Sequence, residues 1–165
     1  MHREAHRGEA GFTLVELLII IGIISILFAV TLIAVDPARR FSESRDAVRR
    51  QDVRSLLEAI VTYITDNGGN YPANLDTVAA SIQVLGTNGS GCNATTCAGY
   101  PVANMTASCS NLSGSLVETY LAAIPTDPLN GTAGNTRYYV NRTAGNRIEV
   151  GSCDPEQVAS ISVKR

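Results

Sequence analysis

Few side chains in this protein could perform catalysis. The 165 residues include two histidines, His2 and His6, and both precede a long apolar segment. The sequence contains neither the Gly-x-Ser-x-Gly turn that presents a nucleophilic serine nor the Gly-rich loop, ending in Lys-Ser/Thr, that binds phosphates. We therefore expect a protein that is not an enzyme and that holds no resident cofactor.

The four cysteines could bind a metal ion or form disulfides. They all follow the apolar segment: Cys92, Cys97, Cys109 and Cys153. Their spacing lacks the two close pairs of a zinc site, and both histidines lie far away near the N-terminus. An even number of cysteines in an extracytoplasmic region favours two disulfides. Three pairings are possible; Cys92–Cys97 is the most local pair and would leave Cys109–Cys153, but the sequence does not choose among them.

The apolar segment covers residues 12–35 and contains one charged residue, Glu16. At about 1.5 Å per residue, a helix of this length crosses a hydrocarbon core about 30 Å thick. The segment is too long for the apolar part of a secretory signal peptide, and no small-x-small cleavage site follows it. The sequence therefore predicts one membrane-spanning helix.

Glu16 is the unusual residue of this segment. A carboxylate inside a membrane helix costs about 2.5–3.5 kcal/mol on insertion scales, and such residues generally have a function. Glu16 lies only four residues after Phe12, where the cost is lower. Considered alone, it is equally a tolerated residue at the membrane surface.

The string Gly11-Phe12-Thr13-Leu14-Val15-Glu16-Leu17-Leu18 resembles the start of type IV pilins, including the pseudopilins of type II secretion and competence systems. In that family a membrane peptidase cuts after the Gly of a polar leader and methylates the new N-terminus, usually Phe. A Glu follows at the fifth mature position. The resemblance implies processing at Gly11 and Phe12. It also implies that Glu16 acts in assembly by pairing with the Phe12 amine of a neighbouring subunit.

The resemblance also implies a function. We expect a structural subunit that polymerises through its N-terminal helix into a type IV pilus or pseudopilus. The expected partners are identical or related pilin subunits, the prepilin peptidase, the pilus assembly platform and the membrane. The subunit would reside in the inner or cytoplasmic membrane with its head outside the cytoplasm, and then in an extracellular or periplasmic filament. The alternative is a minor pilin that binds DNA, a surface or a secreted cargo at a filament tip.

Residues 36–66 continue with the period of an amphipathic helix. Its apolar stripe comprises Val53, Leu56, Leu57, Ile60, Val61 and Ile64. We expect one helix over residues 12–66, bent around Asp36 and Pro37, and ending at Asn67-Gly68-Gly69. Six arginines in this region alternate with acidic residues, and the spacings Asp36/Arg40 and Asp46/Arg50 suit ion pairs on a solvated or intersubunit face. Nucleic-acid binding is possible but is not supported by the formal net charge of −2.

The rest of the chain, residues 67–165, reads as a globular head. Strands are expected at 136–141, 146–150 and 159–163, with a hairpin at Ala144-Gly145, and short helices at 75–85 and 116–123. Residues 69–72, 124–131 and 138–139 resemble segments of the major pseudopilins. The predicted fold class is α+β and pilin-like, with a leader at 1–11, a transmembrane or filament-core helix at 12–35, its amphipathic continuation at 36–66, and the head packed on that helix.

Major pseudopilins hold calcium in a C-terminal loop, so a calcium site is one further implication of the resemblance. The comparable residues, 151–156, contain two carboxylates, Asp154 and Glu156. Calcium takes about six to eight oxygen ligands. We therefore do not expect this stretch to bind calcium.

Overall fold

The computed structural model describes residues 11–75, 78–79, 81–93, 97, 100 and 104–165. It divides into two compact units, residues 1–40 and 41–165. Of the expected leader, residues 1–11, only Gly11 is among the described residues.

The first unit contains helix α1, Leu14–Val35, and none of the residues of α1 is buried. The helix is long and apolar enough to cross a membrane. Its polar side chains bond to its own backbone: Ser25 Oγ donates to the Ile21 carbonyl at 2.7 Å, and Thr31 Oγ1 donates to the Phe28 carbonyl at 2.8 Å. Lipid offers no partner for these hydroxyls, so their internal hydrogen bonds suit a helix surrounded by hydrocarbon.

Helix α2 covers Pro37–Asp66 and follows α1 after one left-handed residue, Asp36, whose φ is 43°. Proline is well suited to the first position of a helix because it has no N–H group to satisfy there. The interruption expected around Asp36 and Pro37 is therefore confirmed. At the other end, Gly69 N donates to the Ile64 carbonyl at 2.8 Å, and both Gly68 and Gly69 have positive φ. This is the αL ending that glycine permits.

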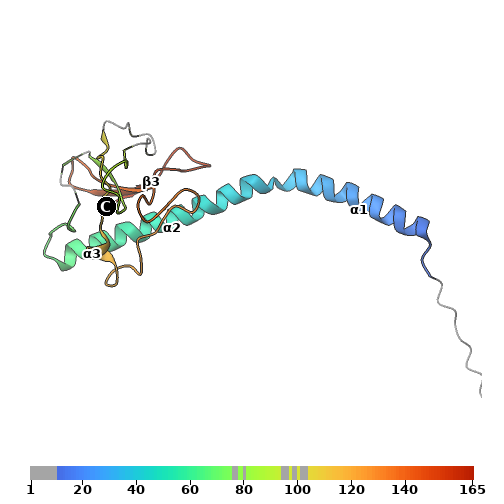
Figure 1. The fold of residues 1–165 in the computed structure, drawn as a ribbon, viewed down its shortest axis with the longest axis horizontal. Helices are drawn as coiled ribbons and strands as arrows, with labels where there is room; N and C mark the ends of the chain where they lie inside the picture. Colours follow the sequence, from blue (N-terminus) through green and yellow to red (C-terminus); the bar gives the residue numbers. More distant parts are fainter. Residues whose placement is uncertain (1–10, 76–77, 80, 94–96, 98–99, 101–103) are drawn as a thin grey trace, which may run out of the picture. The chain divides into compact units, whose positions relative to one another are not determined.

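The head is built on one antiparallel sheet with the strand order β1-β2-β3-β4. The strands are β1 Ile82–Val84, β2 Tyr138–Arg142, β3 Ile148–Ser152 and β4 Ile161–Lys164. The expected hairpin joins β2 to β3, and Val140 pairs with Val150 across it. Figure 1 shows β3 and its sheet beside the green part of α2. The predicted α+β fold, with a helix covering a small antiparallel sheet, is confirmed.

The main core lies between α2 and the sheet. The stripe of α2 contributes Val53, Leu56 and Ile60, all with no exposed surface, and they pack with Tyr138 and Val140 of β2. Successive residues of a strand face opposite sides, so Tyr139 points away from α2. It joins a second cluster with Ile82 and Val84 of β1 and the cysteines. The sheet therefore has an apolar layer on each face.

Two predicted short helices are wrong. The helix expected at 75–85 is replaced at its end by β1, because Ile82 and Val84 pair with β2 and alternate with the less buried Gln83. Residues 76, 77 and 80 lie outside the described part. The helix expected at 116–123 lies earlier, as α3, Ser113–Leu116, because the chain turns at Glu118 with φ 73°. In both places tertiary packing decides the structure, not the local apolar period.

Candidate functional site

The bond between Gly11 and Phe12 lies in an exposed, non-helical segment in front of α1. Residues 11–13 are outside any helix, and the Phe12 side chain is 83% exposed. Apart from its chain neighbours, no described residue has an atom within 4 Å of a Cβ built on Gly11. Exposed segments outside regular structure are the usual sites of backbone cleavage. The predicted processing bond is therefore placed where a peptidase can reach it.

Thr13 and Glu16 form a capping box at the start of α1. Thr13 Oγ1 accepts a hydrogen bond from Glu16 N at 3.2 Å, and Glu16 Oε2 accepts bonds from Thr13 N and Thr13 Oγ1, each at 2.9 Å. The box satisfies two backbone donors that a helix start leaves without partners. We did not predict this local role of Glu16 from the sequence, although Thr-x-x-Glu before an apolar run is the sequence pattern of a capping box.

The four cysteines form two disulfides, Cys92–Cys109 and Cys97–Cys153. Two disulfides were expected, and of the three pairings left open the structure has this one and not the pairing that contains the local pair Cys92–Cys97. Backbone hydrogen bonds explain the difference, because Cys92 N donates to the Ala107 carbonyl and Cys109 N donates to the Asn88 carbonyl. These bonds hold residues 88–92 beside residues 107–109, so Cys92 meets Cys109.

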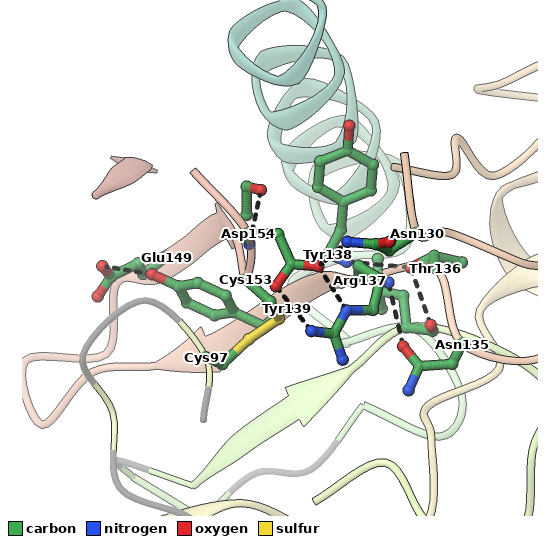
Figure 2. Close-up of a disulfide and its surroundings, with 12 residues drawn as sticks. Cys97, Asn130, Asn135, Thr136, Arg137, Tyr138, Tyr139, Glu149, Cys153 and Asp154 are labelled. Carbon is green, nitrogen blue, oxygen red and sulfur yellow. Dashed lines mark hydrogen bonds and ion pairs between the residues drawn. A yellow bond between two sulfur atoms is a disulfide. The ribbon is translucent and has the colours of Figure 1, made fainter. Parts of the chain in front are cut away.

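The second disulfide joins Cys97 to Cys153, which directly follows β3. Figure 2 shows Cys97–Cys153 beside the Tyr139 ring and the ion pair between Arg137 and Asp154. Arg137 Nε and Nη2 donate to the two carboxylate oxygens of Asp154 at 2.7 and 2.6 Å. The cysteine sulfurs and Tyr139 belong to the cluster on the sheet face away from α2. The disulfides therefore stabilise the residues that pack on that face of the sheet.

Arg49 of α2 is fully buried and binds three carboxylates. Its Nε and Nη2 atoms donate to Asp127 at 2.6 and 3.1 Å, and Nη1 donates to Asp46 at 2.9 Å and to Glu156 at 2.6 Å. Glu156 also accepts from Arg45 Nε at 2.7 Å. The cluster joins α2 to the loop before β2 and to the connection between β3 and β4.

The ion pairs of this cluster shift the pKa values of its members. Burial raises the pKa of Asp46 and Asp127, but bonds from backbone amides and from Arg49 outweigh burial and lower both pKa values. A hydrogen bond from Arg45 is the largest cause that lowers the pKa of Glu156 to about 2; burial opposes it, and a hydrogen bond from Arg49 adds to it. Burial lowers the pKa of Arg49, but its three carboxylates raise it above the usual value. All members are charged at neutral pH, so the cluster acts as a fixed ionic link.

The predicted solvated arginine face is wrong at Arg49, and Asp46 pairs with Arg49 instead of with Arg50. The physical reason is helical phase. Arg49 lies four residues before Val53 and seven before Leu56, so it lies on the apolar stripe of α2. A charged residue in phase with such a stripe is a signal for a buried pair. Asp127, the partner of Arg49, lies between two prolines of its loop. No comparable local pattern in the sequence indicates that Asp127 is buried.

The two carboxylates of residues 151–156 are both held by arginines. Asp154 pairs with Arg137, and Glu156 pairs with Arg45 and Arg49. Within the described ranges, no group of three or more His, Cys, Asp or Glu side chains could hold a metal ion. The described residues of this stretch do not fit a calcium site.

Comparison with known families gives one match, and it includes the predicted processing bond. Residues 6–32 match the family model of the prokaryotic N-terminal methylation motif, which includes Gly11, Phe12 and Glu16. Comparison with curated proteins and with solved structures finds no match.

The motif and the fold agree with each other. Residues 6–32 match the prokaryotic N-terminal methylation motif at the start of an apolar helix, and the head is α+β. This combination supports a type IV pilin-like prepilin subunit and fits insertion in a membrane before assembly.

Proposed function

We propose that this chain is a prepilin-like subunit that is cleaved after Gly11, methylated at the Phe12 amine, and polymerised through α1 into a type IV pilus or pseudopilus. The observation that carries the proposal is the matched methylation motif at the start of a helix whose apolar side chains are all exposed. A contiguous apolar surface of this kind requires a partner. Lipid would cover it before assembly, and the helices of other subunits would cover it in the filament.

The geometry of Glu16 supports a role between subunits. Its Oε2 atom is used by Thr13, and among the described residues no donor approaches Oε1. One carboxylate oxygen is therefore held by the capping box while the other is open to a donor from outside. The Phe12 amine of a neighbouring subunit, which is charged at neutral pH once the leader is removed, is such a donor. In a bundle of apolar helices this pair would set the register of the subunits.

N-terminal mass spectrometry of protein from sheared filaments tests the proposal. We expect the chain to begin at Phe12 with a methylated amine. Gly11→Val should retain the leader and leave the subunit in the membrane fraction, whereas Gly8→Ala, a second leader glycine, should be processed as in the parent. An intact Met1 in filaments, or a mature start at Asp36, would contradict the proposal.

The same filaments test the alternative of a minor pilin at a filament tip. A tip protein is rare in purified filaments, whereas a main structural subunit forms most of their mass. We propose the structural role, and a ratio of one copy to many copies of another pilin would support the tip role instead.

A further inference from the structure

A groove with two arginines lies on the head between α2 and β4. Arg50 and Arg54 line it together with Ser160 and Ser162. Both arginines are exposed, and in the part of the chain that the structure describes neither has an ion-pair partner. They are one turn apart, at i and i+4, so they lie on the same side of α2. We call this surface the basic groove.

A second groove lies between α2 and the turn after α3, and its charge is opposite. Glu58 lines it together with Thr62 and Thr119. Glu58 is exposed, and so is Glu118, which is held at φ 73° next to Thr119. Among the described residues that line this groove there is no cation. We call this surface the acidic groove.

In the described part of the chain, the structure does not pair the charges of the two grooves within one subunit. At about 100° per residue, Arg50 and Arg54 lie roughly 60–100° around α2 from Val53, whereas Glu58 and Thr62 lie roughly 140–180° from it. Arg54 and Glu58 are four residues apart, but the structure joins them by no ion pair among the described residues. Complementary patches at different places on one molecule make a head-to-tail contact, which repeats as a filament when the rotation does not close.

We propose that the basic groove of one subunit faces the acidic groove of a second copy of this chain, with Arg50 and Arg54 of one head opposite Glu58 and Glu118 of the next. The inference rests on the proposed function, because assembly through α1 is what brings the heads together. It adds which surfaces of the head meet, and it makes the contact directional.

Two other occupants of the basic groove fit less well. The groove holds about 240 Å³, less than the roughly 300–1,000 Å³ of pockets for small molecules. A nucleic acid would need a wider basic surface, but the exposed Glu58 lies one helical turn from Arg54 and the chain has a formal net charge of −2. The exposed carboxylates of a second copy match the groove in charge.

Charge reversal in pairs tests the contact in the full-length chain. One variant carries Arg50→Glu and Arg54→Glu, and the other carries Glu58→Arg and Glu118→Arg. Each variant alone places like charges opposite each other at every contact, which costs far more than loss of an exposed ion pair. We expect each to reduce the yield of sheared filaments at least about tenfold, with unchanged amounts of processed, oxidised subunit in the membrane. Arg147→Glu, at an exposed position in the β2–β3 turn, is the matched control.

Co-expression of the two variants should restore the yield, with both chains present in the same filaments, because acidic surfaces then alternate with basic ones. An intrahelical Arg54–Glu58 pair cannot explain restoration by two different chains. Parent-like yields from either variant alone would overturn the inference while leaving the proposed function in place. Loss of filaments from both variants without restoration on mixing would overturn it too. If the parent chain formed no filaments although cleaved at Gly11, the proposed function itself would fail.

Discussion

Arg49 and Asp127 are 78 residues apart in the sequence and form a fully buried ion pair with two parallel hydrogen bonds. Asp127 also accepts bonds from the backbone N–H groups of Leu129 and Asn130, at 2.9 and 3.0 Å. One carboxylate therefore both shapes its own loop and attaches that loop to α2. A buried pair of this kind adds little stability over apolar packing, but removing one partner leaves charge that is buried and unpaired.

Arg49→Met should destabilise the head strongly. It would leave Asp46, Asp127 and Glu156 close together without their shared cation, so we expect a loss of about 3–5 kcal/mol in the free energy of unfolding. Arg50→Met, at the next and exposed position, should change it by less than about 0.5 kcal/mol. Urea unfolding of residues 41–165, the second compact unit, measures both. Equal effects of the two substitutions would show that the buried cluster is not important for stability.

The stability of the head should fall in acid. The folded pKa values of Asp46, Asp127 and Glu156 are lowered, so their contribution is complete above the unfolded pKa values of about 4 and is lost as the pH falls from there through the lower folded pKa values. Stability should decrease from about pH 5 toward pH 2, the folded pKa of Glu156 being about 2. Asp52, whose pKa burial raises, acts in the opposite direction. Urea midpoints between pH 7 and pH 3 measure the loss, and Glu156→Gln should make it smaller. A midpoint independent of pH would contradict the cluster.

The two disulfides should differ in their contribution to stability. Cys97–Cys153 closes a segment with a sequence separation of 56 residues, and Cys92–Cys109 closes one of 17. On the loop-entropy account, removing the longer crosslink by paired Cys→Ala changes should cost about 1 kcal/mol more than removing the shorter one. Peptide mapping without reduction should first find these two pairs and no free thiol. A Cys92–Cys97 peptide would contradict the structure.

Substitutions of Glu16 can separate its charge from its role as a helix cap. Glutamine preserves the capping box, so Glu16→Gln removes only the charge, whereas Glu16→Ala removes both. If pairing with the Phe12 amine drives assembly, both variants should insert in the membrane and both should give few filaments. Filament yield per membrane-bound subunit is the measurement. Parent-like assembly of Glu16→Gln would assign the role of Glu16 to capping alone.

Thr13 provides the matched test of the cap. Thr13→Ser retains the hydroxyl that accepts from Glu16 N, whereas Thr13→Ala removes it and should cost about 1 kcal/mol at the start of α1. If the cap only positions Glu16, Thr13→Ala should reduce assembly less than Glu16→Gln does. The reverse order would mean that the start of the helix matters more than the charge.

Much of the fold could be predicted from the sequence because local patterns determine it. The apolar run determines α1, Asp36-Pro37 determines its end, and the stripe from Val53 to Ile64 determines which face of α2 is buried. The β2–β3 hairpin also follows from local signals, because two alternating segments flank a turn at Ala144. Each of these features needs only residues that are near one another in the chain.

The missed features depend on distant partners. β1 exists because it pairs with β2, more than fifty residues later in the sequence, and Cys97 reaches Cys153 only when the sheet has formed. The burial of Arg49 similarly requires Asp127 from another loop. The candidate site could be predicted, because Gly11, Phe12 and Glu16 lie close together in the sequence and their motif can be identified without any tertiary contact.

The Cys97–Cys153 crosslink determines what a nick in the backbone does to the head. The turn between β2 and β3, with its exposed residues 144–147, lies inside the segment that this disulfide closes. Hydrolysis of a peptide bond there divides the chain into two polypeptides but does not release either of them, since Cys97 and Cys153 lie on opposite sides of the cut. The two pieces separate only when a reductant is present, so under oxidising conditions the head tolerates a proteolytic cut in this turn without losing β3 and β4.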